Sequence, residues 1–266
     1  MYEELTAPLP SVEAYLERIG LAGAEPKPDA EWLDKLVVAQ LTHIPFDDMD
    51  VWGAGAGPSL AVADLFEKII TKRRGGYCYE LNSLFCALLK AIGYDAYTVI
   101  VHLVGGRDHL PPPQHCAIVC NIDGEQYFCD IGFGGPVPNG AVRFDGELYH
   151  GHRIVKKSYF HIVEAKREDA EPAPIMVFKN LPALPVELIP LNFNTSQQPD
   201  SGFRRMLMLN LRLPNGSASV TNLKFSYRNG EESIARELTG LDDLREVLVK
   251  YFGIDPETVP LRELAF

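Results

Sequence analysis

Gly93 marks the change in pattern that most constrains how this chain folds. Before it, apolar residues recur three and four positions apart, which is the spacing of one buried helix face. After it come β-branched and alternating runs separated by Gly, Pro and Asp-Gly turns. Such runs predict a meander of antiparallel strands, arranged as a barrel or a sandwich. The sequence therefore predicts an α+β fold.

Three segments follow from these patterns. In the first, "SVEAYLERIGL" places a helix behind a Ser11 N-cap, and "GYCYELNSLFCALLKAIGY" gives the strongest helix prediction, ended by Gly93. Further hairpins follow from about residue 196, and "LDDLREVLVKYFGI" predicts a closing amphipathic helix. We expect a helical bundle, an all-β part and an α/β part, over residues 1–93, 94–195 and 196–266.

Composition limits the class of protein. The chain has 266 residues, of which 46% are hydrophobic and 23% charged, enough for a sizeable core. No apolar run approaches the ~18 residues of a membrane span, and "MYEELTAPLPSVEAYL" does not resemble a signal peptide. Five cysteines, an odd number, favour free thiols over a disulfide framework. We expect a soluble cytoplasmic protein without a membrane partner.

The charge balance is acidic. Lys and Arg total 25 against 36 Asp and Glu, giving a formal net charge of −11. No run of basic residues forms a stripe, so nucleic acid and anionic membranes are poor partners. An anionic small molecule would need local arginines and backbone N–H groups to bind against this charge.

The stretch "TKRRGGYCYELNSLF", residues 71–85, interrupts the helical pattern around a cysteine. Gly75 and Gly76 allow the chain to turn and place Cys78 in the first turn of the next helix. There the helix N-terminus, with Arg73 and Arg74 upstream, favours a thiolate, and its N–H groups suit a developing oxyanion. The alternative interpretation is a small apolar side chain packed at a helix start.

A thiolate nucleophile needs a base oriented by a third group. "HCAIVCNIDGEQYFCD" predicts a hairpin that turns within residues 122–124. With either possible two-residue loop, His115 and Asp130 project from the same face, as diagonal or direct neighbours. A three-residue loop would separate them, and each residue also has an ordinary structural interpretation. Considered with Cys78, the pattern favours a Cys-His-Asp triad.

The remaining cysteines allow two interpretations. Cys116, Cys120 and Cys129 fall on the hairpin face opposite His115, where a structural zinc site is conceivable. Their spacing is not that of standard zinc ligands, and small apolar residues are ordinary on a buried strand face. Core packing is therefore favoured for these three, and also for Cys86.

Three blocks resemble the signature blocks of arylamine N-acetyltransferases in order and spacing. They are "IPFDDMDVWG" at 44–53, "KIITKRRGGYCYELNSLF" at 68–85 and "HCAIVCNIDGEQYFCDIGFGGPVP" at 115–138. The family's Arg-Gly-Gly-x-Cys-x-Glu-x-Asn block is matched at residues 74–82, and its Asp-x-Gly-Phe-Gly element at residues 130–134. Two departures lie upstream, where Phe46-Asp47-Asp48-Met49 replaces Phe-Glu-Asn-Leu and Gln40 replaces a common His.

The resemblance implies a fold and a reaction. The fold is a helical bundle, a β-barrel and a C-terminal α/β lid around a cysteine-protease-like core. The reaction is a ping-pong acetyl transfer of xenobiotic metabolism, in which Cys78 takes the acetyl group from acetyl-CoA as a thioester. The acceptor is an arylamine, arylhydroxylamine or hydrazine. Acetyl-CoA is then a co-substrate, with no metal and no tightly bound cofactor.

The resemblance also assigns roles to single residues. His115 acts as base and acid, and Asp130 orients it. Phe133 and Gly134 line the acceptor and CoA site, and Phe203 matches a pocket aromatic from the C-terminal part. Two other functions could use the same triad, namely an amide synthase of macrolactam biosynthesis and a Cys-His-Asp hydrolase.

Overall fold

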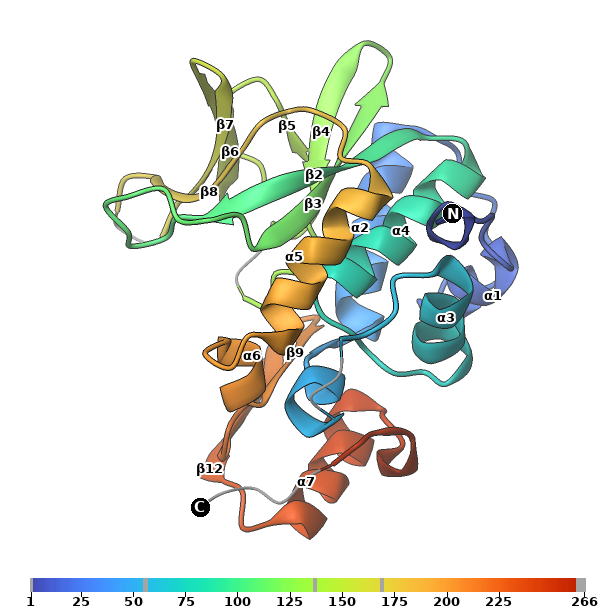
Figure 1. Ribbon diagram of the computed structural model, residues 1–266, viewed down its shortest axis with the longest axis vertical. Coiled ribbons are helices and arrows are strands. Elements are labelled where there is room, and N and C mark those ends of the chain that lie inside the picture. Colours follow the sequence, from blue (N-terminus) through green and yellow to red (C-terminus); the bar gives the residue numbers. More distant parts are fainter. Residues whose placement is uncertain (1, 55–56, 136–137, 168–169, 262–266) are drawn as a thin grey trace.

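The computed structural model describes residues 2–54, 57–135, 138–167 and 170–261 (Figure 1). The helices are α1 (Val12–Arg18), α2 (Ala30–His43), α3 (Val62–Phe66), α4 (Cys78–Ile92), α5 (Pro185–Gln197), α6 (Gly202–Arg205) and α7 (Leu241–Val247). The strands are β1 (Phe46–Asp47), β2 (Asp95–Leu103), β3 (His115–Ile122), β4 (Glu125–Cys129), β5 (Val142–Arg143), β6 (His152–Lys157), β7 (Phe160–Ala165), β8 (Ala173–Phe178), β9 (Met208–Leu213), β10 (Gly216–Thr221), β11 (Lys224–Asn229) and β12 (Glu232–Glu237). Single π-helical turns at Glu67–Thr71 and Leu248–Phe252 extend α3 and α7.

The predicted start of the first helix at Ser11 and the predicted end at Gly93 are confirmed. Ser11 caps α1 by accepting a hydrogen bond from Ala14 N, and Asp29 caps α2 in the same way through Trp32 N. Gly93 ends α4 in the left-handed conformation, with φ of 109°. The helices share one buried core with the outer face of β3.

The middle of the chain forms a seven-stranded antiparallel sheet in the order β5-β4-β3-β2-β8-β7-β6. Its edge strands β5 and β6 contact each other, so the sheet curls into a nearly closed barrel (Figure 1). This resolves the choice between barrel and sandwich. Alternation along β3 sends Cys116, Ile118 and Cys120 toward the helices and Ala117 and Val119 into the barrel interior.

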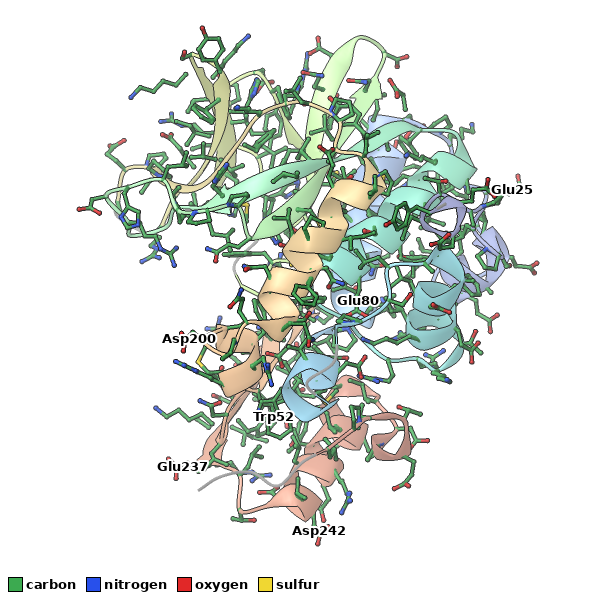
Figure 2. All side chains as sticks on the ribbon, in the orientation of Figure 1. Glu25, Trp52, Glu80, Asp200, Glu237 and Asp242 are labelled. Atoms are coloured by element: carbon green, nitrogen blue, oxygen red, sulfur yellow. The ribbon has the colours of Figure 1, made fainter. Side chains whose placement is uncertain are left out.

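The C-terminal part is a second antiparallel sheet with α7 packed on it, in the order β1-β9-β10-β11-β12. Its edge strand β1 comes from the N-terminal segment, through the pairing of Phe46 with Asn210. Met49 and Trp52 follow β1 into the C-terminal core, and Figure 2 shows Trp52 near that part. The sequence pattern did not predict this exchange of a strand.

Helix α5 was not predicted either. It crosses the middle of the molecule between the barrel and the C-terminal part (Figure 1). We propose that the three buried cores mark the three parts expected from the sequence, residues 1–93, 94–195 and 196–266. Within the described ranges, no helix combines the length and apolarity that crossing a bilayer requires.

Candidate active site

Cys78 is the first residue of α4 and is 2% exposed. The turn before it is held by Glu80, whose Oε2 accepts a hydrogen bond from Tyr77 N at 3.1 Å. The N–H groups of a first helical turn point toward the helix start, and here the N–H of Glu80 donates to Tyr77 O at 3.1 Å. The thiol therefore lies beside the positive end of the helix dipole, as the sequence predicted.

The two glycines before Cys78 are required by close packing rather than by a left-handed turn. The left-handed residue of this loop is Arg73, with φ of 53°. A Cβ on Gly75 would lie 2.2 Å from Pro45 O, and one on Gly76 would lie 3.0 Å from the Glu80 carboxylate. The loop thus fits between β1 and α4 only because both side chains are absent.

The hairpin of β3 and β4 has the first of the two predicted registers. Ile122 pairs with Glu125 across the two-residue loop Asp123-Gly124. Both loop residues have positive φ, 50° and 84°, as a type I′ turn requires. This register places His115 at the start of β3, diagonal to the position that follows β4. Asp130 occupies that position.

A dense hydrogen-bond network joins the two strands to α4. His115 Nε2 lies 2.7 Å from Asp130 Oδ2, and both residues are 1% exposed. Asn82, one helical turn beyond Cys78, donates from Nδ2 to Asp130 Oδ1 at 3.1 Å and to Cys116 O at 2.7 Å. With Nε2 bonded to Asp130, Nδ1 is the ring nitrogen left for Cys78.

The environment favours a positively charged His115. Burial by itself lowers the pKa of His115, but attraction to Asp130 and hydrogen bonds to Asp130 and Cys78 together raise it to about 10. The imidazole is therefore protonated at neutral pH. A buried imidazolium is the partner that a cysteine thiolate requires.

Gly132 fixes the distance between the Asp130 loop and the start of α4. Its N–H donates to Asp130 Oδ1 at 3.0 Å. A Cβ on Gly132 would lie 2.8 Å from Cys78 Cα and 2.7 Å from Asn82 Nδ2. The Gly of the Asp-x-Gly-Phe-Gly element is thus what lets the loop lie directly against Cys78.

A buried ionic cluster supports the loop from behind. Lys68 Nζ lies 2.6 Å from Asp50 and 2.7 Å from Glu80, while Arg74 lies 2.8 Å from Asp50 and 3.4 Å from Asp47. The ion pair of Glu80 is therefore with Lys68, while the neighbouring Arg74 pairs with the two aspartates. Figure 2 shows Glu80 inside the molecule.

Pairing keeps Lys68 and Asp50 charged in this cluster, whereas burial holds the pKa of Glu80 above its usual value although Lys68 lowers it. Burial by itself lowers the pKa of Lys68, but Glu80, Asp47 and Asp50 raise it above its usual value. Burial raises the pKa of Asp50, but Lys68 and Arg74 bring it below its usual value. The cluster is therefore a set of paired charges that holds the loop.

The other four cysteines pack in the core, as favoured from the sequence. Cys86, Cys116, Cys120 and Cys129 are buried free thiols in the core shared by the helices and β3. Cys116 Sγ donates weakly to Cys78 O at 3.5 Å. Among the residues described by the structure, no cluster of three or more His, Cys, Asp or Glu side chains is arranged to hold a metal ion.

The three residues expected to bind substrate lie around the same site. The Phe133 ring packs edge-on against His115, with ring centroids 5.7 Å apart. Phe203, on α6, packs edge-on against Tyr77 at 5.8 Å. Gly134 has φ of 70° and lies against Phe46, whose ring a Cβ there would approach to 2.9 Å. All three border the loop that carries Cys78 or the one that follows Asp130.

Two small hollows extend outward from these residues. One, of about 20 Å³, is lined by Phe46, Phe133 and Gly134, and the other, of about 450 Å³, by Ser217 and Arg228. Gly135, Asn210 and Arg212 line both, so the two hollows are neighbours. Arg212 and Arg228 are the charged residues among the described lining. Sequence patterns did not identify them because they come from separate strands, β9 and β11.

A thiol, an imidazole and a carboxylate lie buried in one cluster between a helical bundle and a β-barrel, an arrangement that suits a thiol-dependent enzyme. A family model described as N-acetyltransferase matches residues 29–259. The chain is 28% identical to the arylamine N-acetyltransferase / N-hydroxyarylamine O-acetyltransferase of Salmonella typhimurium, over 85% of this chain and 83% of that protein. It is 27% identical to the arylamine N-acetyltransferase of Escherichia coli, over 92% of this chain and 89% of that protein.

Solved structures agree with the sequence comparison. The Salmonella typhimurium arylamine N-acetyltransferase superposes with a TM-score of 0.85 and 25% identity, covering 93% of this chain and 92% of that one. The Mycobacterium marinum arylamine N-acetyltransferase in complex with CoA superposes with a TM-score of 0.82 and 24% identity, covering 92% of this chain and 93% of that one. The chain belongs to the arylamine N-acetyltransferase family and is an acyltransferase.

Proposed function

We propose that this protein transfers an acetyl group from acetyl-CoA to an aromatic amine, arylhydroxylamine or hydrazine through a thioester on Cys78. The observation that carries the proposal is the cluster of Cys78, His115 and Asp130. Three chemically complementary groups are buried together, at a helix start that supplies N–H donors. The names of the Salmonella relative support both the amine and the hydroxylamine acceptor.

The first half-reaction forms the thioester. The Cys78 thiolate attacks the acetyl carbonyl carbon, and the bond from that carbon to the CoA sulfur breaks. The leaving CoA sulfur takes a proton from Nδ1 of the His115 imidazolium. Backbone N–H groups of the first turn of α4 stabilise the oxyanion that forms during the attack. Acetyl-Cys78, neutral His115 and CoA thiol result.

The second half-reaction releases the product. The acceptor nitrogen, or the oxygen of a hydroxylamine, attacks the thioester carbonyl, and the bond to Cys78 Sγ breaks. His115 takes the proton that the acceptor loses, which restores the thiolate and the imidazolium. Asp130 holds the same ring nitrogen throughout, so the other always faces the reacting atoms.

The two arginines offer a place for the CoA phosphates. Arg212 and Arg228 line the hollow that neighbours the one at Phe133 and Gly134. Arginine is suited to phosphate because its guanidinium group binds two oxygens at once. The Mycobacterium marinum relative binds CoA, and we propose that here the phosphates reach these arginines while the acetyl end reaches Cys78.

Intact-mass spectrometry tests the thioester. Mixing the protein with acetyl-CoA and no acceptor should add one acetyl mass, located on Cys78 by peptide mapping. Cys78→Ala should remain unmodified, whereas Cys86→Ala, which removes another buried thiol of α4, should acetylate like the wild type. An unmodified wild type, or a Cys78→Ala protein that acetylates equally well, contradicts the proposal.

A further inference from the structure

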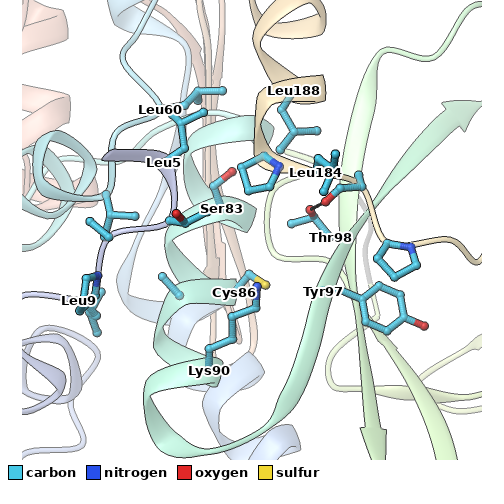
Figure 3. A pocket seen from close by; sticks show the side chains of 18 of the residues that line it. Leu5, Leu9, Leu60, Ser83, Cys86, Lys90, Tyr97, Thr98, Leu184 and Leu188 are labelled. Carbon is cyan, nitrogen blue, oxygen red and sulfur yellow. Dashed lines mark hydrogen bonds between the residues drawn. The ribbon is translucent and has the colours of Figure 1, made fainter. Parts of the chain in front are cut away.

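A larger cavity lies beside another face of α4 (Figure 3). It encloses about 510 Å³, which is within the range of small-molecule sites. Five segments build its wall: the N-terminal segment, the segment that leads into α3, α4, β2 and the stretch that leads into α5. Representative lining residues are Leu5, Leu60, Cys86, Tyr97, Leu184 and Leu188.

This cavity is separate from the proposed acetyl-transfer site. The α4 residues that line it are Ser83, Cys86, Ala87, Lys90 and Ala91, whose spacing of three and four defines one helix face. Cys78 and Asn82 lie on a different face, which contacts Cys116, Asp130 and Gly132. The helix therefore has its catalytic contacts on one side and the cavity on another.

The lining is mostly apolar, with the hydroxyl groups of Thr6, Ser83, Tyr97 and Thr98 and one charged side chain. Lys90 is the charged residue among the described lining, is exposed, and forms no ion pair within the described part of the chain. In Figure 3, Lys90 and Cys86 point into the same part of the cavity. Burial raises the pKa of Cys86 to about 12, so this thiol is neutral at pH 7 and leaves the ammonium charge unbalanced.

The cavity is open to ligands from solvent. Leu184 lines it and is 63% exposed. An apolar body would fill the space between Leu5, Leu60 and Leu188, and an anionic group would complete the pairing at Lys90. Together these features match an amphipathic molecule with a single carboxylate. A phosphate-rich molecule would meet only one cation here.

Helix α5 connects the cavity to the residues beside Cys78. Leu188 lines the cavity, and Asn192, one turn further along, accepts a hydrogen bond from the Tyr77 hydroxyl. Thr195 lies 3.5 Å from the Tyr79 hydroxyl. Since Tyr77 and Tyr79 flank Cys78, a shift at the start of α5 is passed to both neighbours of the nucleophile.

We propose that this cavity is an effector site for a medium-chain carboxylic acid, with its chain in the apolar space and its carboxylate on Lys90. Occupancy alters the reactivity of Cys78 through α5. The site stands independently of the proposed acetyl transfer, since its binding partner, its lining residues and its test are different.

Isothermal titration calorimetry with decanoate tests the binding site. We expect saturable binding of one decanoate per chain. Decanol lacks the carboxylate, so its affinity should be at least about tenfold lower, the factor expected for a lost charge-assisted hydrogen bond. Lys90→Met should weaken decanoate by the same factor, and Ala87→Phe should abolish binding by filling the cavity. Lys157→Met, an exposed lysine on β6, should bind decanoate like the wild type.

Alkylation of Cys78 by iodoacetamide, followed by peptide mass mapping, tests the connection through α5 without any acetyl donor. We expect saturating decanoate to change the alkylation rate at least twofold in the wild type and not in Lys90→Met. The site is disproved by absence of saturable binding, or by binding that Lys90→Met leaves unchanged. The connection is disproved if bound decanoate leaves the alkylation rate of wild-type Cys78 unchanged.

Discussion

Asp130 combines two tasks at the scale of single residues. One carboxylate oxygen holds His115 and the other accepts from Asn82 Nδ2 and Gly132 N. The same side chain therefore orients the imidazole and ties its own loop to α4. A substitution at Asp130 affects both the charge of the histidine and the position of the loop, so the two effects must be measured separately.

The raised pKa of His115 makes stability depend on pH. Because this pKa is about 10 in the folded protein against 6.5 as its ordinary value, the contribution is complete below about pH 6.5 and is lost as pH rises through about 10. Asp130→Asn should remove most of it. We expect the wild-type free energy of unfolding to fall more steeply than that of Asp130→Asn, by up to about 1.4 kcal/mol per pH unit.

Urea unfolding between pH 6.5 and pH 10 measures this difference. His109→Gln is the matched control, because the His109 side chain is 70% exposed and its removal should leave the slope unchanged. If the free energy of unfolding fell equally steeply with pH in the wild type and in Asp130→Asn, the assignment of a buried imidazolium would be contradicted.

The pairing of His115 with Asp130 could be predicted because it depends on local rules. Asp-Gly specifies a two-residue loop, and the loop fixes the register. The role of Asn82 could be predicted in part, since a residue one helical turn after Cys78 lies on the same helix face. The structural role of Gly132 could not be predicted from local rules, because it depends on a contact with Cys78 that no local pattern contains.

At the scale of elements, the start of α4 depends on the ionic cluster of Lys68, Arg74, Asp47, Asp50 and Glu80. Glu80 is 2% exposed and joins the cluster to the turn before Cys78. Removing one partner of a buried pair leaves a charge without compensation, and this destabilises more than removing both. Variants of the cluster can therefore show whether it only supports the loop or also changes the reactivity of the Cys78 thiol.

Lys68→Met should destabilise the protein by about 3–5 kcal/mol, and the double variant Lys68→Met/Glu80→Gln should recover part of the loss. If the cluster is only a support, the folded double variant should still acetylate Cys78. Lys35→Met, which breaks an exposed pair with Glu31, should cost less than about 1 kcal/mol. Chemical denaturation measures the free energy of unfolding of all three variants. A double variant less stable than Lys68→Met would contradict the pairing.

The sequence pattern predicted most elements but not α5 and β1. In α5, Pro190 and several short polar residues disrupt the apolar period, and the helix forms because Leu188 packs in the core and Asn192 and Thr195 contact Tyr77 and Tyr79. Strand β1 has only two residues and exists because β9 pairs with it. Both elements depend on tertiary contacts that a local pattern does not contain.

At the scale of the whole molecule, the net charge of −11 opposes the binding of an anionic co-substrate. The neighbouring hollows lined by Arg212 and Arg228 are a local exception to this charge. They lie where the C-terminal sheet meets the loop after Asp130. The C-terminal part therefore contributes to the proposed donor site, although the proposed catalytic residues lie in the other two parts.

Arg228→Ala should raise KM for acetyl-CoA about tenfold, the factor expected for one lost charged hydrogen bond. It should leave KM unchanged for S-acetyl-N-acetylcysteamine, an acetyl thioester without phosphates. Steady-state kinetics with both donors measures the difference. Lys157→Met, far along the barrel on β6, serves as the charge-matched control and should change neither value. An equal rise of KM for both donors would contradict phosphate binding at Arg228.

We propose that acetyl-Cys78 is the intermediate from which the acceptor takes the acetyl group. Rapid mixing of isolated acetyl-protein, freed of acetyl-CoA, with an arylamine measures this directly. We predict loss of one acetyl mass and formation of one acetylarylamine per chain, at a rate no slower than steady-state turnover. Acetyl-protein that is inert to the amine, or that releases only acetate, would contradict the account.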